Sequence, residues 1–148
     1  MKHCLSILAL AATLSLSACA EQPTGGDLIV DDAWARATAP GQAAAAAYLT
    51  LDNASPTDDR LVGVSTPVGT ASLHRTMVED GIASMKPIDD GLTIAADETA
   101  MLEPQGDHIM IMGLKAPLVA GERFELTLDF EKGEDRTVSV SVVEPGAR

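Results

Sequence analysis

The chain has 148 residues and is acidic: 22 Asp and Glu outnumber 10 Lys and Arg, which gives a formal net charge of −12 at pH 7. This charge excludes nucleic acid and anionic membrane surfaces as electrostatic partners. It favours solubility, which is the simplest explanation for most of the acidic residues. The length suits one domain with a single hydrophobic core.

The first residues of the chain are typical of a secretory signal. A basic tip at Lys2 precedes an apolar run over residues 4–16 that is too short to span a membrane. Residues 16–19 read Leu-Ser-Ala-Cys and resemble the bacterial lipobox, in which the cysteine becomes the acylated first residue of the mature lipoprotein. An ordinary signal peptide, cut beside Ala18 or Ala20, is the alternative.

Processing at this site would divide the chain into three parts. We expect residues 1–18 to be a lipoprotein-type signal peptide, residues 19–26 a flexible tether and residues 27–148 one folded domain. The mature protein would be exported to the periplasm and held at the membrane by lipid on Cys19. It would lose one lysine, which leaves nine basic residues and a net charge of −13. It would also keep no free thiol and no disulfide, since the other cysteine, Cys4, lies in the signal.

The rest of the chain consists of short segments divided by Gly, Pro, Asn and Asp, which predicts an all-β domain. The clearest strands, residues 124–130 and 138–142, alternate apolar and polar residues and form a predicted hairpin. The run Ala43–Ala47 favours a helix by propensity alone, but it passes directly into an alternating segment, so we predict a strand there. Further strands are expected over residues 28–36, 46–52, 61–68, 72–77, 82–87, 92–95, 100–103 and 108–112.

Imidazole and thioether donors recur at a characteristic spacing in these predicted strands. Ten residues separate His74 from Met85, and after 22 more comes the triplet His108-Ile109-Met110. The third histidine, His3, lies in the predicted signal peptide. Both histidines of the mature chain therefore belong to this set of donors.

The segment 108–112 carries its donors on one face. Alternation along a strand places His108, Met110 and Met112 on one side and two isoleucines on the other. We expect the isoleucines to pack in the core, which leaves the opposite face for a ligand or another layer. Taken alone, the methionines are better explained as core filler, because Met commonly fills packing gaps. A histidine two residues before Met110 weakens that explanation.

The other two donors flank a predicted turn at residues 79–81. Antiparallel pairing around this turn would bring His74 and Met85 close together. A lone histidine on a strand is more often a surface residue than a ligand, but four such donors together favour a metal site. Met77 and Met112 are candidate accessory ligands, and Met101 is assigned to the core or the surface.

The donor types indicate which metal such a site would hold. Zinc sites use Cys, His and carboxylates, and calcium sites use oxygen, whereas imidazoles with thioethers suit Cu(I). A blue-copper electron-transfer centre would need a cysteine ligand, which the body lacks. The sequence also offers no thiol nucleophile and no Gly-x-Ser-x-Gly motif, so we expect a binding protein and not an enzyme.

These residues resemble the periplasmic copper chaperones of the PCuAC family. The resemblance rests on the His-x10-Met…His-x-Met pattern, on residues 81–88 and 102–114, on the strand Tyr48–Leu51 and on the C-terminal hairpin, and it covers nearly the whole mature body. It implies a Greek-key β-sandwich or barrel of cupredoxin-like shape. It also implies that the Cu(I) ligands are His74, Met85, His108 and Met110.

The chain departs from the family pattern at two places. Arg75 and Thr76 separate the first histidine from Met77, whereas the family often has a methionine close behind the histidine. This leaves any fifth ligand open. Residues 104–106 read Pro-Gln-Gly where the family usually has Pro-Gly-Gly, and this change should affect only the turn.

The resemblance also implies a function and partners. The protein would be a monomeric, lipid-anchored carrier that passes Cu(I) to an acceptor such as a cytochrome oxidase subunit or a Sco-type protein during respiratory oxidase assembly. Copper storage or resistance would need the same site and stays open as an alternative. A metal-free structural β-sandwich lipoprotein, with its methionines used for packing, is the other.

Overall fold

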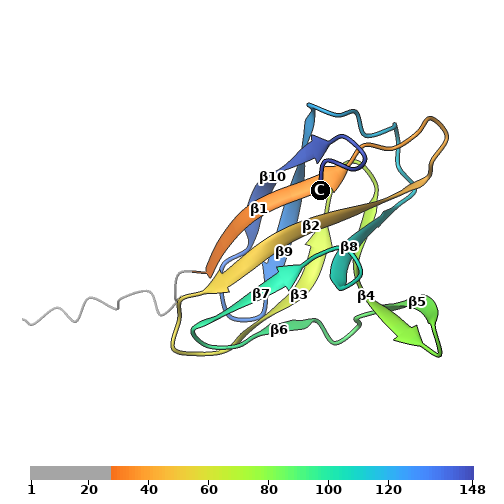
Figure 1. Cartoon of the computed structure of the whole chain (residues 1–148). Coiled ribbons are helices and arrows are strands. Elements are labelled where there is room, and N and C mark those ends of the chain that lie inside the picture. Colours follow the sequence, from red (N-terminus) through yellow and green to blue (C-terminus); the bar gives the residue numbers. More distant parts are fainter. Residues whose placement is uncertain (1–27) are drawn as a thin grey trace, which may run out of the picture.

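The computed structural model describes residues 28–148, which form ten β-strands and no helix (Figure 1). The predicted all-β class is therefore confirmed. The predicted signal peptide, Cys19 and the tether lie outside the described residues. In the part that is described, no helix is long and apolar enough to cross a membrane.

The strands match the predicted segments closely. Their bounds are β1 Leu28–Arg36, β2 Ala44–Asn53, β3 Asp59–Ser65, β4 Thr70–Glu79, β5 Ile82–Pro87, β6 Leu92–Ile94, β7 Glu98–Leu102, β8 Asp107–Met112, β9 Arg123–Phe130 and β10 Arg136–Val143. They form one sheet in the order β5-β4-β8-β2-β1-β10-β9-β3-β6, and β7 pairs with the far half of β2. The sheet folds over on itself, so that β1 and β2 cross in front of β9 and β3 (Figure 1).

The alanine run of β2 shows how packing overrides helix propensity. Ala45 and Ala47 are buried and lie directly opposite Ile111 and Ile109 of β8, so each small side chain faces a large one in the core. A helix of this length would be marginal on its own, because short helices gain little before they pack against other elements. The prediction of a strand at this run is confirmed.

The hairpin of β4 and β5 projects from the body of the domain (Figure 1). Glu79 pairs with Ile82, and the two residues between them, Asp80 and Gly81, have φ angles of 52° and 78°. Positive φ at both central residues is the mark of a type I′ turn, which suits the right-handed twist of a hairpin and favours the Asp-Gly sequence found here. The predicted turn is therefore present, and it sets the register of the two strands.

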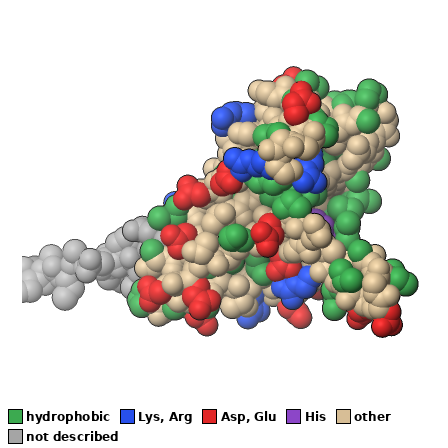
Figure 2. All heavy atoms as spheres, in the orientation of Figure 1, with side chains coloured by type: hydrophobic (Ala, Val, Ile, Leu, Met, Phe, Trp, Pro, Cys, Tyr) green, Lys and Arg blue, Asp and Glu red, His purple; other side chains and the backbone are tan. Residues whose placement is uncertain are grey.

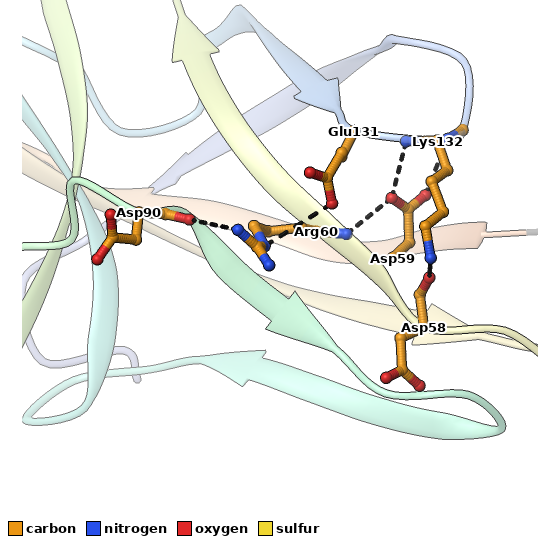
Figure 3. Close-up of polar contacts among 7 residues, drawn as sticks. Asp58, Asp59, Arg60, Asp90, Glu131 and Lys132 are labelled. Carbon is orange, nitrogen blue, oxygen red and sulfur yellow. Dashed lines mark hydrogen bonds and ion pairs between the residues drawn. The ribbon is translucent and has the colours of Figure 1, made fainter.

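A buried carboxylate ties β3 to the turn between β9 and β10 (Figure 3). Asp59 is 8% exposed and accepts hydrogen bonds from the backbone amides of Arg60, Lys132 and Gly133 at 2.7, 3.0 and 2.9 Å. A Cβ atom at Gly133 would lie only 2.9 Å from the Asp59 carboxylate, so a larger residue would disturb this contact. The cluster stabilises one edge of the sheet and contains none of the predicted metal ligands.

Candidate metal site

The two histidines face each other across neighbouring strands. β4 and β8 pair in antiparallel fashion, and His74 lies directly opposite His108. Their ring centroids are 6.1 Å apart, with 25° between the ring planes. A metal–imidazole bond of about 2.0 Å places an ion about 3 Å from a ring centre, so two rings that share one ion are separated by up to about 6 Å. The observed separation of the ring centroids lies at this upper limit.

The two methionines lie on the same face of the sheet as the histidines. Met110 is opposite Ser72, two residues before His74, and Met85 is opposite Thr76, two residues after it. Directly opposed residues share a face, and diagonal neighbours remain within reach of long side chains. The structure therefore brings together on one face all four donors predicted from sequence. Figure 2 shows histidine at the surface among hydrophobic side chains, where the projecting hairpin meets the body.

Burial of this face changes from one end to the other. The core side of β8 is closed, as predicted, because Ile109 and Ile111 are fully buried. On the opposite side His108 is only 4% exposed, whereas Met85 is 58% exposed. One ligand would thus be held inside the domain while another remains accessible to an incoming molecule.

Hydrogen bonds orient the imidazole of His108. Its Nδ1 lies 3.1 Å from the carbonyl oxygen of Gly106, which can only accept, so Nδ1 carries the proton and Nε2 presents a lone pair. The same carbonyl accepts a hydrogen bond from the backbone amide of Thr76 on β4. Such a partner fixes the ring orientation of a metal-binding histidine. Nδ1 of His74 lies 3.4 Å from the hydroxyl of Ser72, and no hydrogen bond reaches Nε2 of either ring within residues 28–148.

The two accessory candidates lie on opposite faces. Met112 pairs with Thr70 of β4 and shares the face of His108 and Met110. Met77 pairs with Ser84 of β5 and lies on the other face, because it is an odd number of residues from His74. This register separates Met77 from the histidines. Met101 is 55% exposed and belongs to the surface, one of the two alternatives expected for it.

An ion pair that sequence reasoning missed lies directly beside the histidines. Arg75 donates from Nε and Nη2, along one edge of its guanidinium, to the two carboxylate oxygens of Asp107, at 2.6 and 2.7 Å. These residues are register partners next to the His74–His108 pair, so the ion pair reinforces the alignment that opposes the rings. The hydrogen bonds to Asp107, and the charge of that carboxylate, raise the pKa of the Arg75 guanidinium above its ordinary value. The sequence signal for this ion pair was two opposite charges, Arg75 directly after His74 and Asp107 directly before His108.

The donor set restricts the metals that this site can hold. Within residues 28–148 no three His, Cys, Asp or Glu side chains are grouped closely enough to hold a metal ion. The further soft donors that the register places on the face of the two imidazoles are thioethers. Such a set is too soft for calcium and unlike a zinc site, and it fits copper in its monovalent state.

Comparisons with known proteins agree with this architecture. The family model "Putative lipoprotein LpqE-like" matches residues 28–142. The "Putative lipoprotein Lxx21020" of Leifsonia xyli subsp. xyli is 37% identical over 114 residues, which are 76% of this chain and 68% of the relative.

Two solved structures are also similar. Cu(I)-DR1885 from Deinococcus radiodurans is 35% identical, with a TM-score of 0.62 over 87% of this chain and 85% of that chain. The apo PCuAC domain from PmoF1 is 26% identical, with a TM-score of 0.68 over 82% of this chain and 97% of that chain. The cupredoxin-like fold expected from the sequence is thus confirmed, and the chain belongs to the LpqE-like family, whose domain is of the PCuAC type.

Proposed function

We propose that the protein is a periplasmic carrier that binds one Cu(I) ion through His74, Met85, His108 and Met110 and passes it to an acceptor protein. The observation that carries this proposal is the register of β4, β5 and β8. It opposes the two histidines and places a methionine on each side of them along one face. The imidazole of His108, held by Gly106, has its Nε2 free for the ion.

The ligand chemistry suits a carrier better than a permanent cofactor site. Two imidazoles and two thioethers are neutral donors, so the bound ion keeps its single positive charge. Thioethers bind Cu(I) without the strength of thiolates and do not form disulfides in an oxidising compartment. Met85 is more than half exposed, so an incoming donor can compete with its thioether for the ion. Release then proceeds by ligand exchange, with no redox change and no catalytic step.

The relatives support the same proposal. The Deinococcus structure is a Cu(I) form, and a PCuAC domain shares this fold. The lipoprotein descriptions of the family and of the Leifsonia relative support lipid attachment at Cys19 and a location at the periplasmic side of a membrane. A cytochrome oxidase subunit or a Sco-type protein is the acceptor that we propose.

A Cu(I) titration in competition with bicinchoninate tests the site. We expect one Cu(I) per chain. We expect His108→Ala and Met110→Leu each to weaken binding by at least about a hundredfold, because removing only the hydrogen-bond partner of a metal ligand already lowers metal affinity about 10–100-fold. Met101→Leu is the matched control, because Met101 is an exposed strand methionine outside the donor set. Unchanged affinity in both site variants would remove the proposal.

A further inference from the structure

The outward face of β8 forms a row of donors that opens toward solvent. His108 is 4% exposed, Met110 is half-buried and Met112 is 49% exposed. Residues of one face are about 7 Å apart along a strand, because each residue advances about 3.4 Å. Met112 is therefore the next soft donor beyond Met110, on the side away from Met85. Gly113 follows it, and a Cβ at Gly113 would meet no atom within 4 Å.

The strands on both sides of this row carry short, uncharged side chains. Met112 lies between Thr70 of β4 and Ala44 of β2, and Met110 lies between Ser72 and Ala46 in the same way. None of these four side chains is long, and Met112 is exposed, so its unbranched side chain has room to change rotamer. Single exposed hydrophobic residues are common and need no explanation. A flexible thioether one step from a metal ligand, flanked only by small residues, is a more specific arrangement.

We propose that Met112 is an exchange donor through which Cu(I) leaves and enters the site. This inference rests on the proposed function. The thioether of Met112 forms a bond to Cu(I) as the bond from Met85 breaks, while Met110 stays bound. The ion moves one step along β8 toward solvent, where an acceptor with soft ligands displaces the remaining donors. Copper stays monovalent throughout, and no proton or electron is transferred.

The register makes this role specific to one of the accessory methionines. Met77 lies on the opposite face and does not reach the ion by this route. Met101 shares the outward side of the sheet and is similarly exposed, but it pairs with Thr50 on the far half of β2 and is not a neighbour of Met110. Met101 is therefore a matched control for an exposed thioether outside the row.

The experiment loads the protein with Cu(I) and follows transfer to bicinchoninate by stopped-flow absorbance, with the dissociation constant measured on the same samples. For Met112→Leu we expect transfer to slow about tenfold, which corresponds to about 1.4 kcal/mol in the barrier. We expect its dissociation constant to change by less than about twofold, or about 0.4 kcal/mol. Met101→Leu should leave both quantities unchanged.

Two results would overturn the role of Met112. Transfer at the wild-type rate would show that copper does not pass this residue. A loss of affinity as large as that of Met110→Leu would make Met112 a resident ligand instead of an exchange donor. Neither result contradicts the proposed function. That function is contradicted separately if the wild-type protein takes up no Cu(I) or if His108→Ala binds Cu(I) as tightly as wild type.

Discussion

The ion pair beside the histidines provides a test of how the register supports the site. Asp107→Asn keeps the size of the side chain but removes the charge that Arg75 binds with two hydrogen bonds. The Arg75 side chain is 51% exposed, so solvent screens the pair. Exposed pairs contribute about 0.2–1 kcal/mol, and the two-point geometry puts this one near the upper end of that range.

We therefore expect Asp107→Asn to weaken Cu(I) binding by about fivefold, since about 1.4 kcal/mol corresponds to tenfold. Affinity falls because β4 and β8 separate more easily next to the point where His74 faces His108. Competition with bicinchoninate measures the affinity, and chemical denaturation of the copper-free protein measures the stability. The effect should shrink at high salt, because screening weakens a pair of this exposure.

The pH dependence of this contribution follows from the raised pKa of Arg75. A raised folded-state pKa means that the stabilisation is fully present below the ordinary pKa of arginine, and that it is lost only as pH rises above that value. The arginine therefore adds no pH dependence to stability between about pH 6 and 9, because that range lies well below the ordinary pKa of arginine.

Glu131→Gln is the matched control for this experiment. It removes the Arg60–Glu131 pair, which has a separation of 3.8 Å and an arginine of similar exposure but lies in the cluster at the other sheet edge (Figure 3). This variant should leave copper affinity unchanged. The reasoning is refuted if Asp107→Asn lowers stability with no change in Cu(I) affinity, or if both variants weaken binding equally.

Two further predictions concern the frame around the site. Asp59→Ala should lower the free energy of unfolding by about 3 kcal/mol in urea denaturation, because a hydrogen bond contributes about 1 kcal/mol and three part-buried amides lose their acceptor. Copper affinity should not change, and a stability equal to wild type would contradict the assigned role. Gly81→Ala places a side chain on a residue with φ of 78°, which costs about 1–2 kcal/mol of backbone strain. This strain should loosen the hairpin that carries Met85, and we expect weaker Cu(I) binding and faster hydrogen exchange in β5. Gly121→Ala imposes similar strain at φ of 88° away from the site, and equal losses of affinity in both variants would argue against a hairpin effect.

Most strands of this domain were predictable because their determinants are local. Alternation at period two marks a half-buried strand, and Asp-Gly marks a tight hairpin turn, so β1 and β5 begin and end at the predicted residues. The alanine run of β2 was harder, because its local propensity opposes its final state. The alternating segment that follows was enough to predict a strand there.

The sequence by itself determined the donors, their softness and their distribution along predicted strands. Alternation alone put His108 and Met110 on the face opposite the core isoleucines. These properties depend on residue type and on spacing within one strand. They do not require knowledge of which strands are neighbours.

Only the tertiary structure decided which donors meet. β4 and β8 are far apart in sequence, and their pairing depends on how the whole sheet folds over its core. That pairing opposes His74 to His108, forms the Arg75–Asp107 ion pair and buries His108. It also assigns Met77 and Met112 to opposite faces. The physical reason is that a register shift of one residue turns every side chain of a strand to the other face, and core packing between non-adjacent segments selects the register.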